Sequence, residues 1–106
     1  MPVVVRNRTG RRRYVLFELL GAEVEWRDVV DAFREAKMRG LNLHLISFDG
    51  RYGIVRCPHL QKEEAIDYLR SIQRMRGTSV KVITHLTSGT IKSTKRKAER
   101  RGIYLR

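Results

Sequence analysis

The stretch LNLHLISFDGRYGIVRCP, residues 41–58, decides the fold of this chain. Leu41, Leu43 and Leu45 alternate with polar residues, which indicates a strand with one buried face. Asp49-Gly50 follows, a dipeptide strongly favoured in two-residue hairpin turns. The segment 51–57, RYGIVRC, is rich in strand-forming residues and stops at Pro58. The sequence therefore predicts a β-hairpin near the middle of the chain.

The segment before the hairpin predicts a strand and then a helix. Residues 13–20, RYVLFELL, indicate a strand buried on both faces, in which only Glu18 is charged. Residues 25–39 have apolar side chains at helical spacing and end before Gly40, which predicts one helix. Its apolar positions are Trp26, Val29, Val30, Phe33 and Ala36.

After the hairpin, residues 61–76 predict a second helix and residues 79–86 a fourth strand. A Lys- and Arg-rich segment that can form a third helix follows. This order predicts an α+β fold of the ferredoxin-like or RRM-like βαββαβ type. We expect a four-stranded antiparallel sheet with two helices on one face, plus a basic C-terminal helix. At 106 residues the chain is expected to be a single domain over 1–106.

The net charge of +12 is concentrated at the two ends of the chain. Residues 1–13 carry +5 and residues 92–106 carry +6, whereas residues 14–91 carry only +1. In the predicted topology the first and fourth strands are neighbours, so the basic arm (1–12) and the basic C-terminal helix or tail (88–106) should meet at one edge. This pattern favours binding to a polyanion. The alternatives, solubility or a heat-adapted surface, predict interspersed signs.

The C-terminal segment is the main candidate for RNA binding. Ser88 or Thr87 can cap a helix that begins near Gly89, and a helix N-terminus also accepts phosphate. Because few apolar residues follow, we expect a segment that lies on an RNA backbone and becomes ordered when bound; the alternative is a solvated helix. The predicted RNA-binding residues are Arg11, Arg12, Arg13, Ser88, Gly89, Thr90, Lys92, Lys95, Arg96, Lys97, Arg100 and Arg101.

The sheet surface offers few aromatic side chains for stacking on bases. Tyr52 and Gly53 fit the aromatic strand motif of RNA recognition motifs, but Ile54 and Cys57 stand where stacking aromatics are expected. Tyr14 and Tyr52 are therefore possible sheet-surface or partner contacts, and another protein could cover the sheet. Packing within the fold is an equally good interpretation for Tyr52.

The sequence gives little support for catalysis by the chain itself. Cys57 and His59 lack a second ligand pair, so no metal site is expected. Glu18 has no nearby carboxylate to help hold a metal; a small metal-dependent nuclease using Glu18 remains the enzyme alternative. A single cysteine and the lack of a signal or membrane-spanning segment predict a cytoplasmic protein with no membrane partner.

Three stretches together resemble one family, protein component 2 of archaeal ribonuclease P. They are RRYVLFEL (12–19), LISFDGRYGIVRCPH (45–59) and TSGTIKSTKRKA (87–98), and the resemblance covers about residues 11–98. It implies a non-catalytic subunit of ribonuclease P that binds the catalytic RNA. That RNA, with Mg²⁺, removes the 5′ leader from precursor tRNA, and the protein itself is expected to bind no cofactor.

The resemblance also implies protein partners. The family pairs with protein component 3, a barrel-shaped subunit, and two such pairs associate through component 2 into a heterotetramer. Other interpretations stay open at this point: a ribosomal or other structured-RNA-binding protein of similar shape, or a protein–protein adaptor. An adaptor leaves the two basic ends unexplained.

Overall fold

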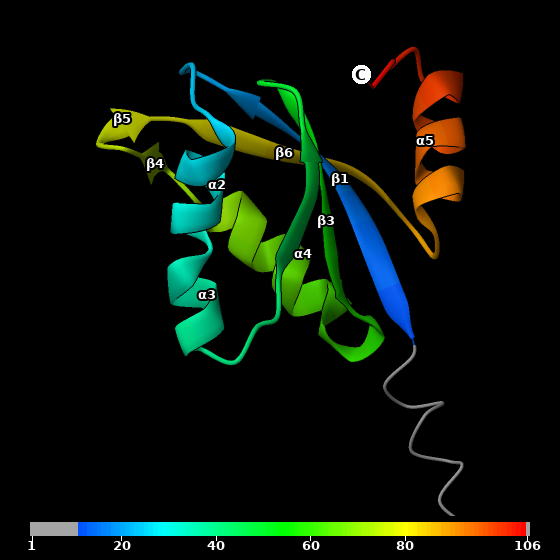
Figure 1. Cartoon of the computed structure of the whole chain (residues 1–106), viewed down its shortest axis with the longest axis horizontal. Helices are drawn as coiled ribbons and strands as arrows, with labels where there is room; N and C mark the ends of the chain where they lie inside the picture. Colours follow the sequence, from blue (N-terminus) through cyan, green and yellow to red (C-terminus); the bar gives the residue numbers. More distant parts are fainter. Residues whose placement is uncertain (1–10, 106) are drawn as a thin grey trace, which may run out of the picture.

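A computed structural model describes residues 11–105; most of the predicted N-terminal arm, 1–12, lies outside them. Its centre is a four-stranded antiparallel sheet in the order β2-β3-β1-β6 (Figure 1). This order and the helices around it confirm the predicted ferredoxin-like α+β fold. The four strands are β1 (Arg12–Leu20), β2 (His44–Phe48), β3 (Tyr52–Pro58) and β6 (Lys81–Ser88).

Three helices cover one face of the sheet: α2 (Trp26–Ala32), α3 (Arg34–Met38) and α4 (Lys62–Ser71). The prediction of one helix over 25–39 is wrong, because the chain makes a tighter turn at Phe33. The Phe33 amide donates to the Val30 carbonyl at 3.0 Å, an i→i−3 bond, while its side chain is buried in the core. The two short helices share a single apolar face.

The helix predicted over 61–76 is also too long. A 3₁₀ turn, η1 (His59–Gln61), precedes α4, and α4 ends at Ser71. A small hairpin follows, made of β4 (Arg74–Met75) and β5 (Thr78–Ser79). Arg76 and Gly77 both have positive φ, +55° and +76°, as a type I′ turn requires. The hairpin buries Met75 in the core on this side of the sheet.

The main core lies between the sheet and these helices. Val15, Phe17 and Leu19 point into it from β1, while Leu16 points to the opposite face. The Phe17 ring stacks on Phe48 with centroids 6.2 Å apart. A Cβ atom on residue 53 would lie 2.4 Å from the Phe17 ring, so glycine is required at that position.

The opposite face of the sheet is covered by α5 (Ile91–Arg100), so helices lie on both sides (Figure 1). A second, smaller apolar cluster fills this interface: Leu16, Ile54, Ala98 and Ile103. No helix within residues 11–105 is long and apolar enough to cross a membrane.

Candidate nucleic-acid interface

The start of β1 and the end of β6 lie side by side, as the topology predicted, so residues 11–13 and α5 lie at the same end of these strands. Tyr14 near the start of β1 pairs with Ser88 at the end of β6. Gly89 lies beside the Arg13 guanidinium, whose Nη1 would be 3.6 Å from a Cβ atom at residue 89. Cations far apart in the sequence therefore contribute to one surface.

The helix cap in this region is Thr90, so the prediction of Ser88 or Thr87 as the cap is wrong. The Thr90 Oγ1 accepts from the Ser93 backbone N–H at 3.0 Å. Ser88 is buried, and its hydroxyl donates to the Ser93 hydroxyl at 2.6 Å. Ser88 therefore helps to fix the start of α5, while the exposed Gly89 and Thr90 form the outer surface of the turn.

Small side chains let α5 pack directly on the sheet. Thr94 and Ala98 are fully buried, and the Thr94 hydroxyl donates to the Thr90 carbonyl at 2.7 Å. The structure of the chain alone thus has a folded and packed α5, where the sequence favoured a segment that becomes ordered on RNA.

The end of α5 is fixed by a Schellman motif, which the sequence analysis missed. Gly102 has φ +81°, its N–H donates to the Glu99 carbonyl, and the Ile103 N–H donates to the Ala98 carbonyl at 2.9 Å. The turn directs Ile103 onto Leu16 and Ile54. A glycine followed by an apolar residue after a basic helix was the sequence signal for it.

The outward side of α5 is strongly basic. Arg101 also donates to the His85 carbonyl at 2.5 Å, which ties the end of the helix to β6. Within residues 11–105, none of the Lys or Arg side chains of this surface takes part in an ion pair. The predicted RNA-binding residues exposed here are Lys92, Lys95, Arg96, Lys97, Arg100 and Arg101.

The arginines on the rest of the molecule differ from these, because many have an acidic partner. Arg34 pairs with Asp31 at 3.2 Å, Arg39 pairs with Glu35, and Arg76 approaches the buried Asp28 at 3.6 Å. Acidic residues are frequent in this part of the chain, whereas Glu99 is the only acid after residue 67. The helical side is therefore close to electrically balanced.

Tyr14 and Tyr52 lie at the margins of the apolar cluster under α5. Both are half-buried and pack against that cluster. The sheet face that would present stacked aromatics in an RNA recognition motif is thus partly covered by the chain's own helix. Base stacking on this face is limited to what its margins expose.

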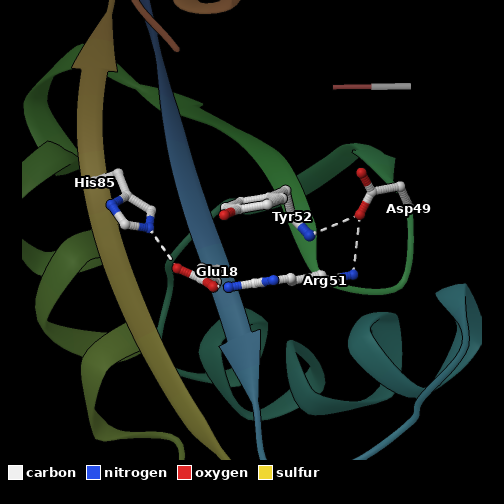
Figure 2. Close-up of polar contacts among 5 residues, drawn as sticks. All are labelled: Glu18, Asp49, Arg51, Tyr52 and His85. Atoms are coloured by element: carbon white, nitrogen blue, oxygen red, sulfur yellow. Dashed lines mark hydrogen bonds and ion pairs between the residues drawn. The ribbon is translucent and has the colours of Figure 1, made fainter. Parts of the chain in front are cut away.

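Glu18 forms a polar cluster with His85 of β6 and with Arg51, which lies in the turn directly before β3 (Figure 2). Its side chain is buried, and its Oε2 accepts from Arg51 Nε at 2.5 Å while its Oε1 lies 2.8 Å from His85 Nε2. Burial raises the pKa of Glu18, but the hydrogen bonds from His85 and Arg51 outweigh it, so the pKa lies below its ordinary value. Glu18 is salt-bridged, and both of its oxygens are engaged.

The turn beside this cluster holds Arg51 in place. The Asp49 Oδ1 accepts from the backbone N–H groups of Arg51 and Tyr52, at 2.9 and 2.7 Å (Figure 2). The Arg51 guanidinium then lies 5.2 Å from the centre of the Tyr52 ring. In the described part of the chain, no group of three or more His, Cys, Asp or Glu side chains could hold a metal ion.

Cys57 and His59, the two residues considered as zinc ligands, both lie within the part of the chain that the structure describes. Burial raises the pKa of the Cys57 thiol, which keeps it protonated and unreactive at neutral pH. His59 is half-buried beside it in the chain, and its Nδ1 is without a hydrogen-bond partner among residues 11–105.

Comparison with known proteins decides the family. The model of the Rpp14/Pop5 family matches residues 13–99, which is most of the chain. The chain belongs to the Rpp14/Pop5 family. This family supplies protein subunits of ribonuclease P-type ribonucleoproteins, and its match confirms the resemblance drawn from the three sequence stretches.

A solved structure shows that this Rpp14/Pop5 member shares its fold with a chain of another ribonucleoprotein. A chain in the cryo-EM structure of yeast ribonuclease MRP matches with a TM-score of 0.60 at 11% sequence identity. The match covers 87% of this chain and 94% of the yeast chain. No curated protein matches the sequence.

Proposed function

We propose that this chain is a non-catalytic protein subunit of ribonuclease P that binds the catalytic RNA. The observation that carries the proposal is the basic surface of α5 together with Arg11, Arg12 and Arg13, whose cations lack acidic partners within residues 11–105. Clustered like charges repel one another, and RNA phosphates offset that repulsion while releasing counterions. Membership in the Rpp14/Pop5 family supports ribonuclease P RNA as the bound RNA in this proposal.

Catalysis is assigned to the RNA of the complex. Hydrolysis by a metal-dependent protein site needs free carboxylates or imidazoles around the ion, and Glu18 is occupied by Arg51 and His85. The catalytic RNA with Mg²⁺ then removes the 5′ leader from precursor tRNA, and the protein holds that RNA in its active form. The chain binds no cofactor of its own in this proposal.

A second surface suits a protein partner. Trp26 and Val30 are large apolar side chains with exposed fractions of 46% and 41%, and they line a groove beside β2. Among residues 11–105, β2 is an edge strand of the sheet and pairs only with β3. An exposed apolar groove beside an open strand edge is typical of a protein-binding site. We assign protein component 3 to this side, with a second copy of the chain completing a heterotetramer.

The basic surface is tested by the salt dependence of RNA binding. If about six phosphates are neutralised, log affinity should fall with log salt at a slope of roughly −4 to −5. Changing Lys95, Arg96 and Lys97 together to Ala should make that slope less steep by about 2 to 3. The matched control changes Lys37, Arg70 and Arg74 to Ala on the helical side, removing the same charge, and should change the slope little.

An equal loss in both triple variants would show a net-charge effect and no specific surface, which contradicts the assignment. The choice of RNA is tested by recovering the chain from its native extract and sequencing the bound RNA. Ribonuclease P RNA accompanied by a barrel-shaped protein supports the proposal. Recovery of ribosomal RNA would favour the ribosomal alternative instead.

A further inference from the structure

We infer that Arg12, His44 and Arg56 form a phosphate-binding pocket on the sheet, separate from the basic surface of α5. The inference rests on the proposed RNA-binding function and extends the RNA contact to three strands. Arg56 and His44 were not among the residues predicted from the sequence. The pocket is the point at which the RNA backbone would cross from the chain ends onto the sheet.

The pocket lies where β1 begins, β2 begins and β3 ends. It is lined by Arg11, Arg12, Asn42, His44 and Arg56, with Cys57 and Pro58. In the register of the sheet, Arg12 lies opposite Pro58 and His44 lies opposite Arg56. Paired residues point to the same face of a sheet, and Arg56 and Pro58 share a face because they are two residues apart on β3. Strand pairing therefore brings Arg12, Arg56 and His44 together on one face.

No negative charge compensates this cluster among residues 11–105. Neither Arg12 nor Arg56 makes an ion pair, and Arg11 makes none either. Like charges held side by side on a sheet are destabilising. An anion bound between the guanidinium groups removes that repulsion and gains charge-assisted hydrogen bonds.

The backbone around the pocket is already fixed. Gln61 accepts from the Asn42 N–H at 2.9 Å and donates to the Gly40 carbonyl at 2.8 Å, which holds the loop before β2. The His59 N–H donates to the Arg11 carbonyl at 3.1 Å, which ties the start of β1 to the end of β3. A binding site held in place before the ligand arrives loses less conformational entropy on binding.

The size of the pocket favours a phosphate group. Its volume is about 170 Å³, below the roughly 300 Å³ at which sites for drug-sized molecules begin. A single phosphate surrounded by arginine and imidazole donors fits both the volume and the charge. Such a phosphate could come from the RNA backbone, from an RNA 5′ end or from free inorganic phosphate.

The three histidines of the chain provide an internal test, because only His44 lines the pocket. In an NMR titration of the full chain, the imidazole signals of His44, His59 and His85 are followed separately; a His44→Asn variant assigns the first. The probes are inorganic phosphate, a short RNA with a 5′-hydroxyl and the same RNA with a 5′-phosphate. We expect the 5′-hydroxyl RNA to shift His44 and leave His85 nearly unmoved.

Arg56→Gln removes one pocket cation. It should lower RNA affinity roughly tenfold, make the salt slope less steep by about 1, and abolish the His44 shift. The matched control is Arg70→Gln on α4, which should leave the RNA affinity, the salt slope and the His44 shift unchanged. Melting curves of both variants confirm that the fold is intact.

The outcomes separate the pocket from the proposed function. RNA binding with an unmoved His44 overturns the pocket and leaves the function standing. A His44 shift that appears only with inorganic phosphate, or only with 5′-phosphorylated RNA, overturns the backbone source and identifies a free or a terminal phosphate. If no RNA binds at all and ribonuclease P RNA is not recovered from the extract, the proposed function fails first.

Discussion

The two faces of the sheet are stabilised differently. The face toward α2, α3 and α4 buries large apolar side chains such as Phe17 and Leu69 and carries surface cations that often have acidic partners. The face toward α5 has a small cluster built around Leu16, Ile54 and Ala98, and the lysines and arginines of α5 beside it make no ion pair within residues 11–105. The helical face therefore contributes most of the buried apolar core. The α5 face carries uncompensated positive charge, which suits the binding of a polyanion.

The largest effect is expected on the helical face. Phe17→Ala removes a fully buried ring that stacks on Phe48, and it should lower the free energy of unfolding by about 3–5 kcal/mol. Urea unfolding followed by circular dichroism measures the loss. Phe17→Leu is the conservative control and should lose much less. A small loss for Phe17→Ala would show that the helical face does not carry the main core.

The α5 face should respond locally. Ile103→Ala removes the side chain that holds the end of α5 on Leu16 and Ile54, at a cost of about 2 kcal/mol, the low end for buried aliphatic residues. Hydrogen exchange should then speed up in α5 while the sheet stays protected. Ile103→Val is the control.

If Ile103→Ala accelerated exchange in β1 and β3 as much as in α5, both faces would belong to one cooperative unit and the comparison would fail. If only α5 is affected, the RNA affinity should fall along with the amide protection of α5. The reason is that the exposed lysines and arginines would no longer be held in one arrangement.

The strands and their topology could be predicted from the sequence, because period-two patterns and a glycine-containing turn are local signals. The turn itself lies one residue later than predicted: the Asp49 N–H donates to the Tyr52 carbonyl at 3.0 Å, so Gly50 and Arg51 are its two central residues. The end of α4 could not, because Ile72 and Met75 continue its apolar spacing, although Ile72 is the residue just after α4 and Met75 packs from the following hairpin. The basic ends were predictable from topology, but the pocket was not. It depends on the register that places His44 opposite Arg56, and an irregularity of the β-bulge type between Leu45 and Ser47 shifts this register by one residue. The alternating sequence pattern of β2 does not predict that shift.

The ion pair of Glu18 should make the stability of the sheet depend on pH. Because its folded-state pKa is lowered by His85 and Arg51, Glu18 contributes stability above its ordinary pKa of 4.5. That contribution is lost as the pH falls through the folded-state value. Glu18→Gln should therefore destabilise the protein by about 1–3 kcal/mol at pH 7, with a difference from the wild type that shrinks in acid.

The measurement is urea unfolding at a series of pH values from neutral to acidic. Glu23→Gln is the matched control, since Glu23 is exposed and makes no ion pair within residues 11–105. It should show little difference from the wild type at any pH. A constant gap between Glu18→Gln and the wild type across the series would mean that Glu18 acts through shape and not through its charge.

The smallest effect tests how α5 begins. Thr90→Ala removes the hydroxyl that accepts from the Ser93 N–H and should cost about 1 kcal/mol, seen as faster amide exchange in the first turn of α5. Thr90→Ser keeps the acceptor and should behave like the wild type. Because Ser88 also bonds to Ser93, the turn retains one anchor in the alanine variant, so the helix should fray without detaching. Loss of the whole of α5 on this single change would show that the cap, and not the packing of Ala98 and Ile103, holds the basic surface in place.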